Sequence, residues 1–113
     1  MSKKISLNFK GKSLKLNVTI CNSFRKFSGL MFKSRDTEIL LFEFSKNTEI
    51  RIHSFFVFFP FFAIWIDDKN KIVQIKKVKP FTFSVRPKES FRKILEIPIN
   101  EKNREILKLL VGD

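Results

Sequence analysis

Apolar and polar residues alternate through the first twenty positions of the chain, with one interruption at Lys10 and Gly11. An apolar period of two is typical of a strand with one buried and one solvated face, and a pair that contains glycine suits a tight turn. The pattern therefore predicts an N-terminal β-hairpin. Its inward-facing positions are Ile5, Leu7, Phe9, Leu14, Leu16, Val18 and Ile20.

Two other segments repeat their apolar residues every three or four positions, as a helix does. The first spans residues 22–31, where Asn22 or Ser23 can cap the start of a helix. The second spans residues 101–111, and Gly112 can end it. We therefore predict one short early helix and one C-terminal helix.

Further segments are rich in β-branched and aromatic residues and are bounded by polar turns, as strands are. They cover residues 39–44, 50–59, 61–66, 72–78 and 94–97, and residues 80–87 are expected to be extended. Closely spaced strands with few helices are typical of an antiparallel, jelly-roll-like sandwich or barrel, and we expect this mainly β fold. Residues 55–66 form the densest apolar run, so we expect them to be largely buried, with residues 55–59 central in the sheet.

Size and composition fit a single domain that spans residues 1–113. Hydrophobic residues make up 43% of the chain, and fifteen phenylalanines predict a phenylalanine-rich core.

Cys21 is the only cysteine, so neither an internal disulfide nor a thiolate zinc site is expected, and a reducing cytoplasm fits. The longest uncharged apolar run contains Pro60 and is shorter than the roughly 20 residues of a membrane-spanning helix, so no membrane insertion is expected.

Four segments carry a recognisable pattern: KFSGLMF at residues 26–32, ILLFEF at 39–44, IHSFFVFFP at 52–60 and LEIP at 95–98. In sequence, order and spacing they resemble the family known as domain of unknown function 192. Residues 65–83 are similar to its archaeal branch, so the resemblance covers residues 18–98. It implies a compact, mainly β, jelly-roll-like or barrel-like domain with a short early helix, and it brings no established substrate, cofactor or catalytic residue.

Two departures from the family pattern bear on chemistry. Phe62 stands where the family commonly has an aspartate, which removes the most chemically capable group of the motif. Lys33 stands where the family commonly has an arginine, and an ammonium group donates to an anion without the planar bidentate fork of a guanidinium. An activity that needs the aspartate is therefore not expected of this chain.

Candidate catalytic groups are few. His53 is the only histidine, and no orienting partner or metal-ligand spacing accompanies it, which favours a structural role. Asp67 and Asp68 are adjacent, and a turn would expose both to water. Glu96 faces away from its apolar neighbours along a strand, so we expect it to be solvated or paired with a lysine. No metal site and no cofactor is expected.

Positive charge is segregated along the chain. Lys and Arg number 23 against 11 Asp and Glu, which gives a net charge of +12. Residues 1–35 carry nine basic and no acidic residues, residues 71–93 carry eight basic residues and one acid, and residues 36–70 carry three basic residues and six acids. Such a chain is attracted to polyanions in a salt-dependent way, although a lysine-rich surface can also be purely compositional.

These observations favour a small, non-enzymatic, cytoplasmic domain that binds an anionic ligand or partner. One alternative is a nucleic-acid-associated protein without sequence preference, because phenylalanines are interleaved with basic residues at positions 79–93. Another alternative is a small-molecule enzyme that uses His53. The oligomeric state is left open. The candidate anion-binding residues are Lys26, Lys33, Lys76, Lys79, Arg86, Arg92 and Lys93.

Overall fold

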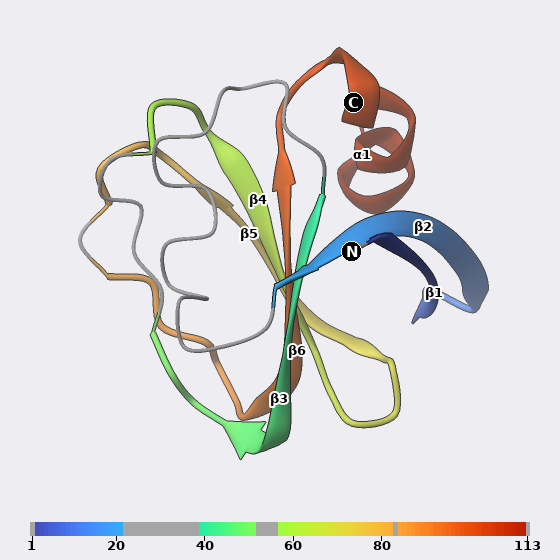
Figure 1. Ribbon diagram of the computed structural model, residues 1–113, viewed down its shortest axis with the longest axis vertical. Coiled ribbons are helices and arrows are strands. Elements are labelled where there is room, and N and C mark those ends of the chain that lie inside the picture. The colour runs from blue at the N-terminus through green and yellow to red at the C-terminus, as the bar shows by residue number, and fades with distance from the viewer. Residues whose placement is uncertain (1, 22–38, 52–56, 83, 113) are drawn as a thin grey trace.

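A computed structural model describes residues 2–21, 39–51, 57–82 and 84–112 of the chain. Over these residues the protein is mainly β, with a helical segment near the C-terminus, and both features agree with the expected fold class (Figure 1). The early helix predicted for residues 22–31 lies outside the described residues. The strands are β1 Ser2–Phe9, β2 Lys12–Cys21, β3 Leu40–Thr48, β4 Phe61–Ile66, β5 Ile72–Val78 and β6 Phe91–Pro98, followed by the 3-10 turn η2 Glu101–Asn103 and the helix α1 Arg104–Val111.

The six strands form one sheet in the order β1-β2-β3-β6-β4-β5. All neighbouring strands are antiparallel except β2 and β3, which run parallel where Thr19 to Cys21 lie beside Leu40 to Phe42. The expectation of a purely antiparallel sheet is therefore wrong at this pair. A parallel neighbour needs a crossover of a dozen or more residues, and residues 22–39 are long enough to provide it.

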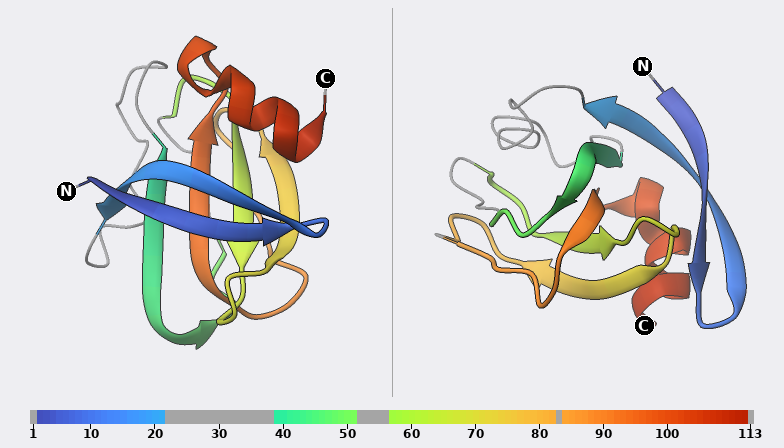
Figure 2. Two further views of the ribbon diagram at one scale, coloured as in Figure 1. Left: turned by 90° about the vertical axis from the view of Figure 1, so that its right-hand side faces the viewer. Right: turned by 90° about the horizontal axis from the view of Figure 1, so that it is seen from below.

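The N-terminal hairpin is confirmed. Lys10 and Gly11 have φ angles of 50° and 76°, the left-handed values that a two-residue hairpin turn requires, and glycine adopts them without a steric cost. The turn sets a register that runs from Phe9 opposite Lys12 to Ser2 opposite Thr19. The hairpin crosses one face of the remaining sheet at a large angle and lies below α1 (Figure 2).

The sheet curls into a half-barrel because its two outer strands approach each other at one point. The Asn8 backbone N–H donates to the Asn70 carbonyl across 3.2 Å, and Asn8 forms an isolated parallel bridge with Lys71, the residue before β5. No jelly-roll or two-sheet sandwich is formed by the described strands, which belong to this single curled sheet.

Side chains are buried on both faces of the central strands β3, β6 and β4. One face packs against the hairpin and α1, and the other packs against residues 57–59, Val78 and Val85. Burial on both faces explains why β4 is apolar at all six positions instead of alternating. The largest fully buried side chains are Trp65, Phe42, Phe59, Phe61 and Phe91.

The strand predicted at residues 50–59 is not observed at its described positions. Ile50, Arg51 and residues 57–59 lie outside any strand, and residues 52–56 lie outside the described part of the chain. Within the described part of the apolar run, residues 57–66, most side chains are buried, as expected, but Phe58 is 58% exposed. The strand that is buried on both faces begins only after Pro60, because proline has no N–H to donate within a ladder.

We expect Leu41→Ala to lower the free energy of unfolding by about 2–5 kcal/mol, because Leu41 is fully buried and its removal leaves a cavity. Phe58→Ala should cost less than about 1 kcal/mol, since most of that ring is in contact with solvent. Urea denaturation of both variants measures the difference. Equal losses of stability in the two variants would show that this placement of the apolar run is wrong.

Candidate functional site

At one end of the half-barrel, charged residues take over positions that are apolar elsewhere on the same face. Lys3 lies two residues before Ile5 on β1, Glu43 lies two residues after Leu41 on β3, and Lys93 is opposite Glu43 on β6. Because side chains alternate along a strand, Glu43 and Lys93 project from the face that the hairpin covers, and Lys3 projects from the hairpin toward that face. Apolar burial on this face therefore ends at a charged rim.

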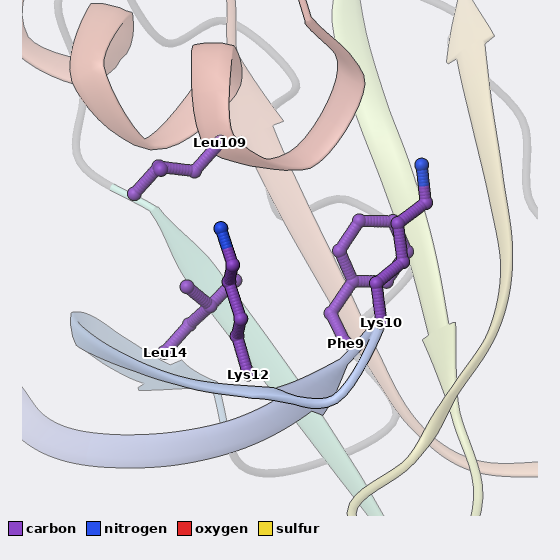
Figure 3. A pocket seen from close by; sticks show the side chains of 5 residues that line it. All are labelled: Phe9, Lys10, Lys12, Leu14 and Leu109. Atoms are coloured by element: carbon purple, nitrogen blue, oxygen red, sulfur yellow. The ribbon is translucent and has the colours of Figure 1, made fainter.

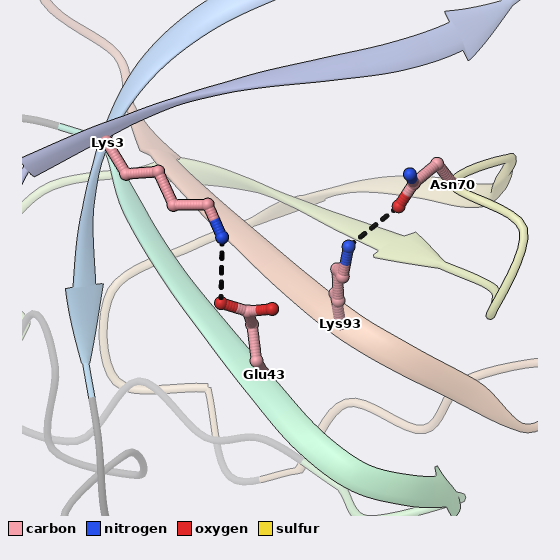
Figure 4. A network of polar contacts seen from close by, with 4 residues as sticks. All are labelled: Lys3, Glu43, Asn70 and Lys93. Carbon is pink, nitrogen blue, oxygen red and sulfur yellow. Dashed lines mark hydrogen bonds and ion pairs between the residues drawn. The ribbon is translucent and has the colours of Figure 1, made fainter.

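Polar contacts hold this rim together (Figure 4). The Lys3 Nζ lies 3.7 Å from Glu43 Oε1, and both side chains are partly exposed. The Lys93 ammonium donates to Asn70 Oδ1 across 2.7 Å. An exposed ion pair of this length stabilises a fold by at most about 1 kcal/mol, so Lys3 can exchange this partner for another anion at little cost.

The turn between β4 and β5 positions Asn70. Its φ of 62° is left-handed, a conformation that asparagine tolerates better than most residues. Asp67 fixes the turn, because its Oδ1 accepts from the backbone N–H groups of Lys69 and Lys71, each across 2.9 Å. The expected turn at Asp67 and Asp68 is confirmed, and its role is to present Asn70 to Lys93.

An open cavity of about 230 Å³ lies between β1 and this rim. We call it the β1 cleft. Three lysines, an asparagine and a serine belong to its lining, and the described residues contribute no carboxylate to it. Glu43, next to Lys3, neutralises part of the positive charge. The β1 cleft is lined by Lys3, Lys4, Ile5, Ser6, Leu7, Asn70 and Lys93.

Among the predicted anion-binding residues within the described part of the chain, only Lys93 lines the β1 cleft. Lys76, Lys79 and Arg86 are exposed and form no part of it. Arg92 is half-buried, and its Nε donates to the Phe44 carbonyl across 2.7 Å, which indicates a structural role. The remaining candidates, Lys26, Lys33 and His53, lie outside the described residues.

Sequence reasoning missed Lys3, Lys4, Ser6 and Asn70. For Lys3 a signal was available, because it is in phase with the apolar positions of β1 and therefore points inward with them. Asn70 carried no comparable signal, since its contact with Lys93 spans 23 residues of sequence.

Glu96 departs from expectation in a different way. It is only 6% exposed, and on its two sides in the sheet it pairs with Leu40 and Ala63, whose side chains belong to the apolar cluster on that face. Within the described residues it forms no ion pair with a lysine, so the expected solvation or pairing is not observed there. Burial raises the pKa of Glu96 from 4.5 to about 8. On the same face, the Nε1 of buried Trp65 has no hydrogen-bond partner among the described residues.

Two further cavities lie between the hairpin and α1. The smaller, of about 110 Å³, is lined by Phe9, Lys10, Lys12, Leu14 and Leu109, and the Lys12 side chain points toward α1 between Leu14 and Phe9 (Figure 3). The larger, of about 380 Å³, runs between β2 and α1. Leu109 borders both and is 58% exposed, which gives this side of the molecule an apolar character that the β1 cleft lacks.

Comparison with known proteins identifies the family. The profile of domain of unknown function 192 (DUF192), described as "Uncharacterized ACR", matches residues 5–112. The chain belongs to the DUF192 family. This DUF192 protein is also 31% identical over 93 residues to a UPF0127 protein of Thermococcus sibiricus (strain DSM 12597 / MM 739). The match covers 80% of this chain and 60% of that relative, so the chain spans less than two thirds of the length of the curated relative it matches.

Two crystal structures share the fold of this DUF192 protein. One is a "putative transcription regulator" of Sinorhizobium meliloti 1021, with a TM-score of 0.74, 16% identity, and coverage of 93% of this chain and 84% of that one. The other is a protein of unknown function of Novosphingobium aromaticivorans DSM 12444, with a TM-score of 0.75, 12% identity, and coverage of 93% and 78%. At these identities the likeness concerns the fold alone.

The part of the chain that the structure describes holds no group of three or more His, Cys, Asp or Glu side chains close enough to bind a metal ion. It also has no helix that combines the length and the apolar character needed to span a bilayer.

We expect Glu96→Gln to change the pH dependence of stability. Below about pH 4.5 the Glu96 carboxyl is protonated in both the folded and the unfolded protein. As the pH rises, the carboxyl of the unfolded chain ionises first, while the folded protein keeps the proton up to about pH 8. The free energy of unfolding of the native protein should therefore fall between these pH values, by roughly 1.4 kcal/mol for each unit that separates the two pKa values, and the Gln variant should lack this fall. Urea denaturation at pH 5, 6.5 and 8 measures it. If the free energies of unfolding of the native protein and the Gln variant changed in parallel with pH, the prediction of a buried, protonated Glu96 carboxyl would be wrong.

Proposed function

We propose that this DUF192 protein is a non-enzymatic binding module that holds an anionic ligand in the β1 cleft. The observation that carries the proposal is that Lys3, Lys4 and Lys93 all line one cavity of about 230 Å³. Asn70 and Ser6 add neutral hydrogen-bond donors to the same lining. Ammonium groups together with amide and hydroxyl donors are the groups that proteins offer to phosphate and carboxylate oxygens.

The charges of the β1 cleft remain available to a ligand. Lys93 donates to one acceptor in its described contact, and an ammonium group has three hydrogens to donate. Lys4 is exposed on the face of β1 opposite to Lys3. The net charge of +12 raises the local concentration of anions around the whole molecule, and the β1 cleft offers a place where several donors meet one anion.

Tripolyphosphate is a suitable probe of this proposal. At low salt we expect saturable changes in the amide NMR signals of residues 3–7 and 70, and an affinity that falls as salt rises. Lys4→Gln combined with Lys93→Gln should weaken binding about tenfold, because each exposed charge contact contributes up to about 1 kcal/mol.

The matched control is Lys76→Gln combined with Lys79→Gln, which removes the same charge from exposed positions outside the β1 cleft. Its effect on affinity should be less than about twofold. Equal weakening by the two double variants would mean diffuse attraction to the whole surface, and an absence of saturable binding would overturn the proposal.

A second candidate function, binding of single-stranded nucleic acid, is favoured by one aromatic pair. Phe58 and Phe81 are 58% and 50% exposed, and their ring centroids are 5.3 Å apart in an edge-to-face arrangement. Phe81 has a left-handed φ of 59°, which is unusual for a bulky residue, and the exposed Lys79 precedes it by two positions. Exposed aromatic rings beside basic residues are the platform on which bases stack. The structural neighbour described as a "putative transcription regulator" is compatible with this candidate.

For the second candidate we expect Phe81→Ala to lower the affinity for a twelve-nucleotide oligothymidine about tenfold, because stacking on one aromatic ring is worth about 1–3 kcal/mol. Leu109→Ala removes an equally exposed apolar side chain near α1 and serves as the control. Fluorescence anisotropy at several salt concentrations measures both variants. An unchanged affinity in Phe81→Ala would exclude the aromatic pair as a binding platform.

A further inference from the structure

The hydrogen-bond phase of β1 follows from its turn. In a two-residue hairpin the residues that flank the turn exchange two backbone hydrogen bonds, so Phe9, and every second residue before it, points its N–H and C=O toward β2. Asn8, Ser6 and Lys4 must then point theirs to the other side. The bond from the Asn8 N–H to the Asn70 carbonyl, at 3.2 Å, agrees with this phase.

This outer edge of β1 is occupied only at its end in the described part of the chain. Asn8 meets Asn70 and Lys71, and among the described residues this is the single bridge that β1 forms with anything other than β2. The backbone groups of Ser6 and Lys4 follow along the same edge, and both residues line the β1 cleft. The cleft is therefore the place where the half-barrel stops short of closing, and it is bordered by an open strand edge.

Lysines lie on both sides of that open edge. Lys3 and Lys93 belong to the inward side, as their contacts with Glu43 and Asn70 show, and Lys4 is exposed on the outward side. A strand laid along the edge would direct its side chains alternately to these two sides. Acidic side chains on either side of such a strand would then face an ammonium group, and cross-strand pairs of opposite charge are favourable.

We infer that the ligand of the β1 cleft is an acidic peptide segment in extended conformation, which adds to the sheet as a neighbour of β1. This inference rests on the proposed anion-binding function and assigns its partner class. The N–H and C=O groups of Lys4 and Ser6 supply four main-chain hydrogen bonds, and the three lysines select for acidic side chains. Two outward-pointing residues on β1 correspond to a bound segment of about five residues.

A small anion such as phosphate would use the ammonium groups and leave the strand edge unpaired. A ligand whose backbone can form hydrogen bonds therefore distinguishes an extended peptide from a small anion. The probe is acetylated hexaglutamate amide, and its partner probe is the same peptide with every backbone nitrogen methylated. Both peptides carry the same charge, and only the first can pair with a strand edge. We expect the methylated peptide to bind at least tenfold more weakly in calorimetric titrations at low salt.

A proline substitution tests the edge from the side of the protein. Ser6→Pro removes one outward N–H and leaves the β1–β2 pairing and all three lysines in place, because that N–H faces away from β2. It should lower the affinity for hexaglutamate at least fivefold more than the affinity for the methylated peptide and for tripolyphosphate, which lose only the Ser6 hydroxyl. Ser13→Pro is the matched control, since Ser13 lies opposite Asn8 and its N–H points away from β1 on the other edge of the hairpin.

The outcomes separate this inference from the proposed function. Equal affinities for hexaglutamate and its methylated form would overturn strand addition and leave anion binding in the β1 cleft intact. Binding of tripolyphosphate without binding of hexaglutamate would also overturn strand addition and leave anion binding intact. It would show that the lysines of β1 protect its edge from pairing, as edge lysines often do. Failure of all three probes to bind would overturn both proposals. Weaker binding of the methylated peptide together with the Ser6→Pro effect would support the inference.

Discussion

Burial of both faces of β3, β6 and β4 is the constraint on which the remaining structure depends. A sheet that is apolar on both sides needs a cover on each side, and the chain supplies the hairpin and α1 for one face and residues 57–59 with Val78 and Val85 for the other. The crossed hairpin, the parallel pair of β2 and β3, and the position of the C-terminal helix can all be understood as ways of covering this central unit.

The same constraint explains why Glu96 differs from every other acid among the described residues. It sits on a central strand where both faces are apolar, so no orientation within the strand would bring its carboxyl to water. Desolvation then favours the protonated form and raises its pKa to about 8. The polar residues that line the β1 cleft avoid this cost, because they lie at the rim, where the central strands end and solvent enters.

The β1 cleft arises where the cover is incomplete. The hairpin reaches β5 only through Asn8, and the edge of β1 before that residue has no strand beside it within the described residues. An open edge next to inward-pointing lysines combines directional backbone donors with positive charge. A closed barrel would have used the same backbone groups internally and left only a charged surface, so the proposed binding site depends on incomplete closure.

Local patterns were sufficient for the hairpin, for β4 and β5 and for the C-terminal helical segment, because alternation, turn residues and helical periodicity act between near neighbours in sequence. They failed at residues 57–59, since an apolar run looks the same whether it pairs as a strand or packs as a covering segment. They also failed for Glu96. The alternation of side chains along a strand specifies the face to which a side chain points, but it does not specify whether that face is exposed to solvent. Only the tertiary structure decided that Lys3, Asn70 and Lys93 meet. The sequence specifies the chemistry of each side chain, but the curl of the sheet that brings them to one cleft is set by contacts among distant strands.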